Sequence, residues 1–311
     1  MENLENKRIT LIANPTSQSG GAKDIALFVM SYLSDHNIDA NLVFTRFSND
    51  ARDIAKEASP KTDLIIAIGG DGLIHEIMNG LMEVDKSERA AFGLIPAGTG
   101  NDYARSLHMS LKPKEAVEQL FKAKLVDADL GVCNGEYYAQ TLSFGLDAAI
   151  GLGSVERRIK TGKTGTRVFF DEGIYQLRNH LDLYNFKCEY VDAAGDSQEI
   201  SAETYMFAAQ IGKTYGGGFK ICPKAEINNG FIECCYVTPK LNPLNAIRIF
   251  VMAKDGHHTH NKRIHFFNAK SLKITIEGTP KIQMDGEPCT DYVLDLGVSR
   301  DAVRVLKFFE D

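Results

Sequence analysis

An apolar run in this chain stops abruptly at Gly69-Gly70-Asp71-Gly72, and apolar residues at helical spacing follow at once. The run before the glycines resembles a buried strand, and Leu73, Ile77 and Leu81 share one side of the predicted helix. A strand, a glycine turn and a helix in this order direct backbone N–H groups and the positive helix end at a phosphate. Asp71 would repel bare phosphate, so the turn favours phosphoryl transfer, with a metal ion or a substrate hydroxyl near the carboxylate.

The same order of elements occurs twice more in the first hundred residues. The strand-like run at residues 8–14 opens into a polar loop, and so does the run at residues 92–96. Alternating strands and helices predict a parallel sheet with right-handed crossovers. Ligands of such sheets bind beyond the carboxyl ends of the strands. We therefore expect the three loops to meet at one sheet edge and form a site there.

The pattern of the chain changes near residue 126. Short strand-like runs now alternate with turns, of which Asn134-Gly135 and Asn229-Gly230 are the clearest. This pattern predicts a mainly antiparallel β-sandwich, interrupted by helices near residues 145–158, 167–181 and 241–256. We therefore expect an α/β domain with a parallel sheet over residues 1–125 and a β-rich domain over residues 126–300.

Composition narrows the class of protein. The chain has 311 residues, 44% of them hydrophobic, which is enough for two cores. Its formal net charge of −6 gives no basic footprint for nucleic acid. The first residues lack the apolar core of a signal peptide, and no apolar run approaches the length that spans a bilayer. We expect a cytoplasmic protein that meets any lipid transiently, at a membrane surface.

The six cysteines show neither CxxC spacing nor a zinc-like cluster. Reduced and mostly buried thiols are therefore expected. Cys234 and Cys235 are adjacent in a predicted strand, so they should point to opposite faces of the sheet.

Four motifs in order resemble one enzyme family. NPTS at residues 14–17, GGDG at 69–72, PAGTGND at 96–102 and MDGEP at 284–288 are similar to those of the soluble diacylglycerol kinase and sphingosine kinase family of lipid kinases. NAD kinases share GGDG, but the order and spacing of the motifs together are specific. The resemblance spans nearly the whole chain. It implies an active site in the cleft between the two domains and a C-terminal segment, residues 301–311, that returns to the first domain.

The resemblance also implies a lipid kinase that uses ATP and Mg²⁺, with a diacylglycerol-like lipid as the first guess for the acceptor. Glu287 is favoured as general base, and Asp71 is the second candidate catalytic residue. Asp71 and Asp102 are the candidate ligands of the catalytic Mg²⁺. Candidate ATP contacts lie on the loops and strand ends of the first domain: Asn14, Pro15, Thr16, Ser17, Thr45, Gly69, Gly70, Asp71, Gly72, His75, Gly98, Thr99 and Asn101.

In the second domain the resemblance implies two further sites. Asp147, in SFGLDAA, is a candidate contact for the lipid hydroxyl. Glu226, Asn229 and the carbonyl group of Phe231 match a loop that can hold a structural Mg²⁺. The family usually has Asp where this chain has Asn229, and an amide is a poorer ligand for Mg²⁺ than a carboxylate.

A second departure from the family is Leu73, which stands where the family has Thr. The missing hydroxyl would remove a hydrogen bond to phosphate worth about 0.5–1.5 kcal/mol. Reduced activity or an altered nucleotide preference would follow.

The segment at residues 157–167 is locally basic, with Arg157, Arg158, Lys160, Lys163 and Arg167. Three interpretations stay open: a solvated loop, a contact with ATP phosphates, or attraction to anionic lipid, at about 1 kcal/mol per basic residue.

Two other functions stay open for the whole chain. One is an NAD kinase-like enzyme, and the other is a catalytically weak nucleotide-binding regulator. The presence of Asp71, Asp102 and Glu287 together argues against the regulator. The sequence leaves the oligomeric state open, a homodimer included.

Overall fold

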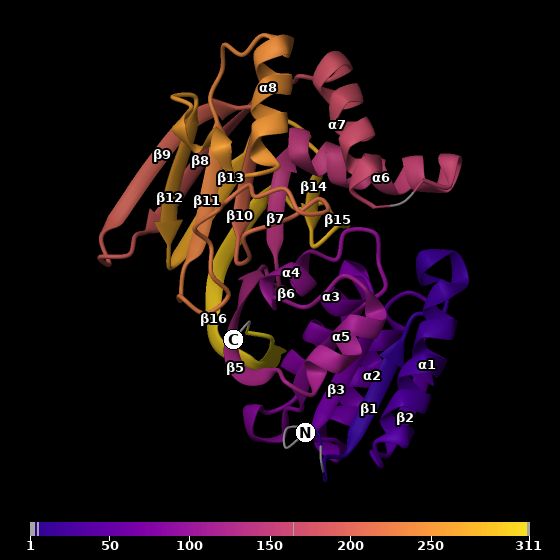
Figure 1. Cartoon of the computed structure of the whole chain (residues 1–311). Helices are drawn as coiled ribbons and strands as arrows, with labels where there is room; N and C mark the ends of the chain where they lie inside the picture. The colour runs from indigo at the N-terminus through magenta and orange to yellow at the C-terminus, as the bar shows by residue number, and fades with distance from the viewer. Residues whose placement is uncertain (1–3, 5, 164, 310–311) are drawn as a thin grey trace. The chain divides into compact units, whose positions relative to one another are not determined.

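The computed structural model describes residues 4, 6–163 and 165–309 and divides the chain into two compact units (Figure 1). Unit 1 runs to Leu130 and resumes at Arg300, and unit 2 spans Gly131–Ser299. The predicted boundary between residues 125 and 126 falls inside strand β5 (Lys124–Cys133), whose last residues belong to unit 2.

Unit 1 is built on a parallel sheet with the strand order β2-β1-β3-β4. The end of the C-terminal strand β16 (Val293–Lys307) extends this sheet, because Val305 pairs in parallel with Phe92 of β4. The inner strands are buried over their whole length, as expected for parallel strands covered on both faces. The four strands are β1 (Ile9–Ala13), β2 (Ala40–Phe44), β3 (Leu64–Gly69) and β4 (Ala91–Pro96).

Helices connect these strands and cover the sheet. Leu73, Ile77 and Leu81 of α3 are buried, as their spacing predicts. Gly80 allows α2 to approach α3 closely, since a Cβ there would lie 2.2 Å from the carbonyl oxygen of Arg52. The α-helices are α1 (Gly21–Asp35), α2 (Asp50–Ala58), α3 (Asp71–Met82), α4 (Asp102–Ser106) and α5 (Pro113–Leu120), with short 3-10 turns η1 (Ser17–Gly20), η2 (Ser59–Lys61) and η3 (Lys86–Glu88).

Unit 2 contains two antiparallel sheets. One has the order β12-β11-β10-β7-β14-β15, and the other pairs β9, β8, β13 and the first half of β16. The short strand β6 (Glu136–Tyr138) pairs with β5. The remaining strands are β7 (Thr141–Gly145), β8 (Tyr184–Val191), β9 (Ser197–Thr204), β10 (Met206–Gln210), β11 (Ile232–Val237), β12 (Ile264–Ala269), β13 (Ser271–Ile276), β14 (Ile282–Met284) and β15 (Glu287–Cys289).

The two sheets of unit 2 enclose an aromatic core. The rings of Phe144 and Phe207 stack at 5.5 Å between centroids, and Phe186 of the other sheet meets both edge-on. Cys234 belongs to this core, whereas Cys235 faces the helices on the other side of its sheet, as predicted. All six cysteines are free thiols, and five of them are buried.

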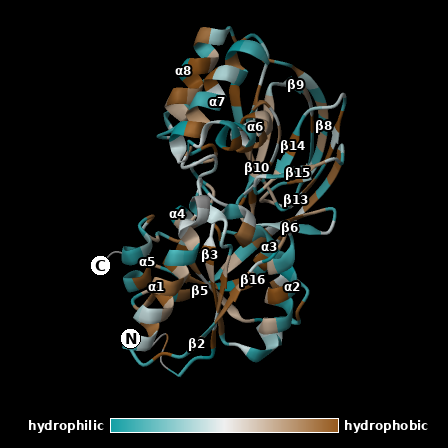
Figure 2. Ribbon diagram, turned by 90° about the vertical axis from the view of Figure 1, so that its right-hand side faces the viewer, coloured by the Kyte–Doolittle hydropathy of each residue, from teal (hydrophilic) through white to brown (hydrophobic). Residues whose placement is uncertain are grey.

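Three helices cover the outer face of the six-stranded sheet of unit 2. They are α6 (Leu146–Thr161), α7 (Thr166–Asn179) and α8 (Pro243–Ala253), followed by the 3-10 turn η4 (His257–His260). Helices α7 and α8 lie side by side in both Figure 1 and Figure 2. Their inner side chains form a second apolar core with Tyr205, Cys235 and Val237 of the sheet.

The predicted fold class is confirmed, and so are the three predicted helices of the second domain. Asn134 and Gly135 have positive φ angles of 50° and 90° and form the β5–β6 hairpin. Asn229-Gly230 also turns, but it joins no hairpin, because the preceding strand β10 ends at Gln210. Among the described helices, none combines the length and the apolar character that crossing a membrane requires.

Candidate active site

The predicted loops of unit 1 meet at one edge of its sheet. Backbone hydrogen bonds join them: Asn14 N–H donates to the carbonyl oxygen of Ile68 at 3.3 Å, and Ala97 N–H donates to that of Gly69 at 2.7 Å. Thr45, after β2, donates its N–H to the carbonyl oxygen of Ala13 at 2.9 Å. The prediction that these loops share one edge is therefore confirmed.

Two glycines bring the second and third loops into backbone contact. A Cβ on Gly98 would lie 2.3 Å from the Cα of Gly70, and a Cβ on Gly70 would lie 2.8 Å from the Cα of Gly98. Only glycine fits at either position. The contact places the N-terminus of α3, with its backbone N–H groups, beside the loop at residues 97–101, which suits an anionic ligand.

Asp71 and Asp102 converge at this edge. Asp71 Oδ1 accepts a hydrogen bond from the backbone N–H of Asp102 at 2.9 Å. A Cβ on Gly100 would lie 2.6 Å from Asp71 Oδ2 and 3.0 Å from Asp102 Oδ2, so both oxygens face the same small space. Arg105 Nη1 lies 3.5 Å from Asp102 Oδ1 and partly balances the negative charge.

This pair of carboxylates suits Mg²⁺. Carboxylate oxygens are hard ligands, and protein-bound Mg²⁺ often takes only one or two of them, with water and phosphate oxygens as the rest. In the part of the chain that the structure describes, no group of three or more His, Cys, Asp or Glu side chains is arranged to hold a metal ion. Water and phosphate oxygens would complete a metal site at Asp71 and Asp102.

Several candidate ATP contacts shape the loops themselves. Asn14 Oδ1 accepts from both the N–H and the hydroxyl of Thr16, at 2.9 and 2.8 Å. Asn101, with a φ of 54°, is hydrogen-bonded to both backbone groups of Gly98. These side chains hold the loop backbone in place. The other candidates lie on the same loops, at the end of β3 or in the first turns of α3: Pro15, Ser17, Gly69, Gly72, His75 and Thr99.

Leu73 has a packing role. It is buried, and a Cβ on Gly69 would lie 2.5 Å from its Cδ2 atom, so its side chain folds back over the end of β3. A threonine hydroxyl at this position would replace apolar contacts within the turn.

In unit 2, Asp147 lies in an apolar pocket between the six-stranded sheet and helices α6, α7 and α8. The pocket encloses about 80 Å³ and is lined almost entirely by apolar side chains, among them Phe169, Phe219 and Phe250. Asp147 is 5% exposed, and neither carboxylate oxygen has a hydrogen-bond partner of good geometry among the described residues. Burial raises its pKa to about 7, although the Ser143 hydroxyl and nearby backbone N–H groups oppose the shift.

Two residues near Asp147, Ser143 and Gln283, are not among the predicted site residues. Gln283 of β14 donates from Nε2 to the hydroxyl of Ser143 at 2.7 Å, which leaves the Ser143 proton free to reach Asp147. The Oε1 atom of Gln283 accepts from Gly286 N–H at 2.7 Å. A chain of polar contacts thus runs from the β14–β15 turn to Ser143, whose hydroxyl opposes the rise in the pKa of Asp147. No local pattern marks Ser143 and Gln283, because only the pairing of β7 with β14 brings them together.

Glu287 is the first residue of β15 and is exposed. The turn before it is held by Asp285, whose carboxylate accepts from the N–H groups of Ala139, Gln140 and Thr141 at 2.7, 2.9 and 3.0 Å. Asp285 therefore fixes the position of the hairpin that carries Glu287. The MDGEP motif does not predict this role of Asp285, because the N–H groups that it binds lie about 140 residues earlier in the sequence.

The residues predicted to hold a structural Mg²⁺ have other contacts in the structure. Glu226 forms an ion pair with Lys213 at 2.5 Å. Asn229 Oδ1 accepts from the N–H of Phe231 at 3.0 Å in a local turn. The Mg²⁺ site at Glu226, Asn229 and the carbonyl group of Phe231 stays a prediction.

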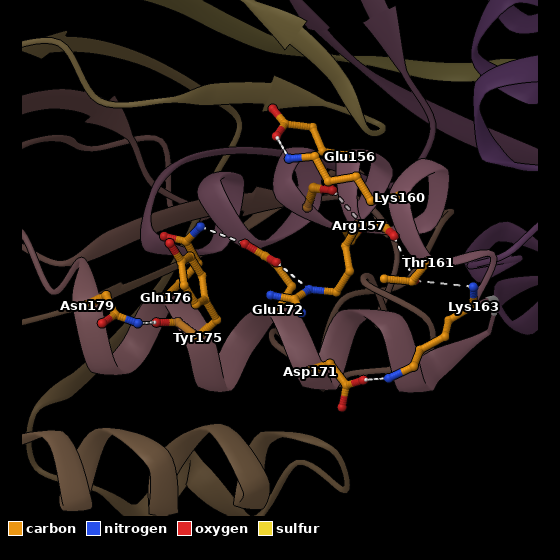
Figure 3. A network of polar contacts seen from close by, with 12 residues as sticks. Glu156, Arg157, Lys160, Thr161, Lys163, Asp171, Glu172, Tyr175, Gln176 and Asn179 are labelled. Atoms are coloured by element: carbon orange, nitrogen blue, oxygen red, sulfur yellow. Dashed lines mark hydrogen bonds and ion pairs between the residues drawn. The ribbon is translucent and has the colours of Figure 1, made fainter.

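The basic segment ties α6 to α7 (Figure 3). Arg157 Nε donates to Glu172 Oε2 at 2.6 Å, and Gln176 Nε2 donates to the other oxygen of Glu172 at 2.7 Å. Lys163 pairs with Asp171 at 2.7 Å. Arg157 and Lys163 therefore have partners within the protein. These contacts do not decide between a solvated loop, a contact with ATP phosphates and attraction to anionic lipid.

Two family comparisons cover most of the chain. Residues 8–133 match the diacylglycerol kinase catalytic domain, and residues 143–307 match the YegS C-terminal NAD kinase beta sandwich-like domain.

Curated relatives agree with these matches. A diacylglycerol kinase of Bacillus subtilis is 28% identical and aligns over 90% of both chains. A diacylglycerol kinase of Staphylococcus saprophyticus is 26% identical, over 90% of this chain and 89% of the relative. The fold is similar to the crystal structure of a diacylglycerol kinase from Bacillus anthracis, with a TM-score of 0.76 and 21% identity, covering 97% of this chain and 98% of that one.

Proposed function

Because the chain belongs to the diacylglycerol kinase family, whose members are phosphotransferases with an alcohol acceptor, we propose that it phosphorylates the hydroxyl of a diacylglycerol-like lipid with ATP and Mg²⁺. The observation that carries the acceptor class is the apolar pocket of unit 2 with its single buried carboxylate, Asp147.

The pocket suits a lipid better than a polar acceptor. Its lining offers apolar contacts to a hydrocarbon chain, and Asp147 offers a hydrogen-bond partner to one hydroxyl. Its volume of about 80 Å³ is below the roughly 300–1,000 Å³ of typical ligand pockets, so acyl chains would enter only if the covering helices move apart. A dinucleotide such as NAD would leave its phosphates and ribose hydroxyls without partners in this lining.

The donor side of the proposal rests on unit 1. The glycine loops and the N-terminus of α3 provide backbone N–H groups for phosphate, and Asp71 with Asp102 would hold the Mg²⁺. When bound, Mg²⁺ neutralises the charge of the transferring phosphoryl group. Asp71 also fixes the start of α4 through its hydrogen bond to Asp102 N–H.

Glu287 is the proposed proton acceptor for the lipid hydroxyl. A general base must be deprotonated and must be held in a defined place. The three backbone hydrogen bonds of Asp285 provide that support, so we regard Asp285 as the positioning residue of Glu287.

A lipid acceptor also implies how the enzyme meets it. We expect a peripheral contact with the cytoplasmic face of a membrane, because ATP is supplied on that side. A homodimer stays a prediction, to be checked by sedimentation.

The test is an assay with radiolabelled ATP against lipids in mixed micelles, with NAD as a separate acceptor. We expect label in a diacylglycerol-like lipid and none in NAD. Asp71→Asn and Glu287→Gln should each lower kcat at least about a hundredfold, the scale of a group that acts in the transition state.

Asp53→Asn, at an exposed carboxylate on α2, is the matched control and should keep full activity. Label in NAD would favour the NAD kinase-like alternative. Nucleotide binding without transfer to any acceptor would favour the regulator.

A further inference from the structure

Helix α8 is apolar on the side that faces solvent as well as on the side that faces the protein. Ala246, Ile249, Phe250 and Ala253 line the pocket. On the other side, Leu244 is 79% exposed and Val251 is 47% exposed. Ile247 lies between them at helical spacing. We call Leu244, Ile247 and Val251 the outer face of α8; Figure 2 shows the apolar colouring of this helix. Asn245 and Arg248 are exposed on the same helix, and exposed apolar side chains beside a basic one are typical of a helix that lies in a membrane interface.

Helix α7 also carries an exposed apolar side chain. Phe170, which is also exposed, lies 5.8 Å from Phe250 between ring centroids, and a Cβ on Gly173 would touch the same ring. Both helices therefore carry exposed apolar side chains, and Phe170 reaches α8 through Phe250.

Basic residues accompany this surface. Residues 240–254 contain no Asp or Glu, in a chain with a net charge of −6, and Lys240 and Arg248 are exposed. Lys254 is directed elsewhere, since its Nζ atom donates to the carbonyl oxygen of Gly217 at 3.0 Å. Arg248 is exposed on α8 itself. The surface thus combines apolar side chains with positive charge, which is complementary to anionic lipid.

We propose that the outer face of α8 lies in the interface of an anionic membrane, with the lipid pocket directly beneath the same helix. This deepens the proposed function and rests on it for the lipid pocket. The 11 residues of α8 are too few to span a bilayer but enough to lie along its surface. An acyl chain then passes from the membrane to the pocket by displacing the helix that separates them.

A second copy of the chain is a poorer occupant. In a symmetric dimer built on α8 the same face meets itself, so Arg248 of each copy would approach basic residues of the other without an acidic partner on the helix. A membrane that carries phosphatidylglycerol removes this repulsion.

The experiment is co-sedimentation of the full chain with vesicles of phosphatidylcholine alone or with phosphatidylglycerol. The wild type should bind the anionic vesicles, and binding should weaken as salt rises. Leu244→Glu and Val251→Glu should each lower the partition coefficient about tenfold or more, since each removes one apolar side chain from the interface and adds a charge. Arg248→Gln should lower binding to anionic vesicles only.

Leu27→Glu is the matched control, because Leu27 is a 52% exposed leucine on helix α1 of unit 1. It should bind like the wild type. Equal binding of Leu244→Glu and Leu27→Glu, or no binding of the wild type, would overturn the proposal. So would a dimer that Leu244→Glu dissociates while vesicle binding stays normal, because the face would then be a contact between copies.

Activity on a short-chain diacylglycerol dissolved as monomers separates this proposal from the proposed function. Leu244→Glu should keep that activity and lose activity on vesicle-embedded lipid. No activity of the wild type on either lipid would count against the proposed function instead.

Discussion

At the scale of single residues, Asp147 combines a buried charge with an apolar pocket. The pKa of its carboxyl is about 7 in the folded protein and 3.8 in the ordinary, solvated state. Between these values the folded protein holds a proton that the unfolded chain has released. Stability due to this group is therefore complete below about pH 4 and is lost as pH rises through 7.

The size of this pH effect follows from the shift. The pKa of Asp147 rises from 3.8 to about 7, which corresponds to a fall in the free energy of unfolding on the order of 4 kcal/mol as pH rises. Asp147→Asn has no proton to lose, so its free energy of unfolding should not show this fall. Denaturant unfolding of both proteins between pH 4.5 and 8 checks this; a difference between them that does not change with pH would contradict it.

Leu73 is a second residue whose environment decides its effect. Leu73→Thr removes buried apolar contacts with Gly69 and should destabilise the protein by about 2 kcal/mol. We expect the KM for ATP not to improve, because the hydroxyl replaces packing. Leu27→Thr, at an exposed leucine, should change stability by less than about 0.5 kcal/mol. A lower KM for ATP in Leu73→Thr without loss of stability would restore the interpretation based on the missing phosphate contact.

At the scale of elements, the ion pair between Arg157 and Glu172 joins α6 to α7 (Figure 3). Glu172 is buried, whereas Arg157 is partly exposed. Arg157→Gln leaves the buried carboxylate of Glu172 with one partner, Gln176, and should lower the free energy of unfolding by about 3 kcal/mol. Glu172→Gln leaves a cation that reaches water and should cost less.

A double-mutant cycle isolates this pair. The control is Lys160→Gln, because Lys160 pairs with Glu156 at 3.7 Å and both side chains are exposed. This change should alter the free energy of unfolding by less than about 0.5 kcal/mol. Equal effects of Arg157→Gln and Lys160→Gln on urea unfolding would show that the α6–α7 pair is not structural.

At the scale of the whole molecule, each unit has its own core and its own proposed ligand. ATP with Mg²⁺ should slow hydrogen exchange in unit 1, at residues 14–21, 69–73 and 97–105. A short-chain diacylglycerol should slow exchange in unit 2, in α6, α7 and α8. At a ligand concentration 100 times Kd, each ligand should raise the free energy of unfolding of the state that it binds by about 2.7 kcal/mol.

The control for this exchange experiment is ATP without Mg²⁺, which should protect unit 1 less, since Asp71 and Asp102 then repel the phosphates. Protection of α7 and α8 by ATP alone would contradict the assignment of ligands to units.

The sequence by itself determined the features that depend on neighbours along the chain. The strand, glycine turn and helix around Asp71 are local, so their type and order could be predicted, and so could the change to antiparallel strands after residue 126. The loops of unit 1 were placed at one edge because parallel strands all end on the same side.

The tertiary structure alone decided the features that join distant segments. Asp285 holds the N–H groups of Ala139, Gln140 and Thr141, which no spacing in the sequence connects. Ser143 and Gln283 meet only because β7 pairs with β14. The pocket around Asp147 exists because α8, about a hundred residues later in the chain, packs against α7 and lines the same space as α6. Such contacts depend on the packing of whole elements, and no local pattern encodes their geometry.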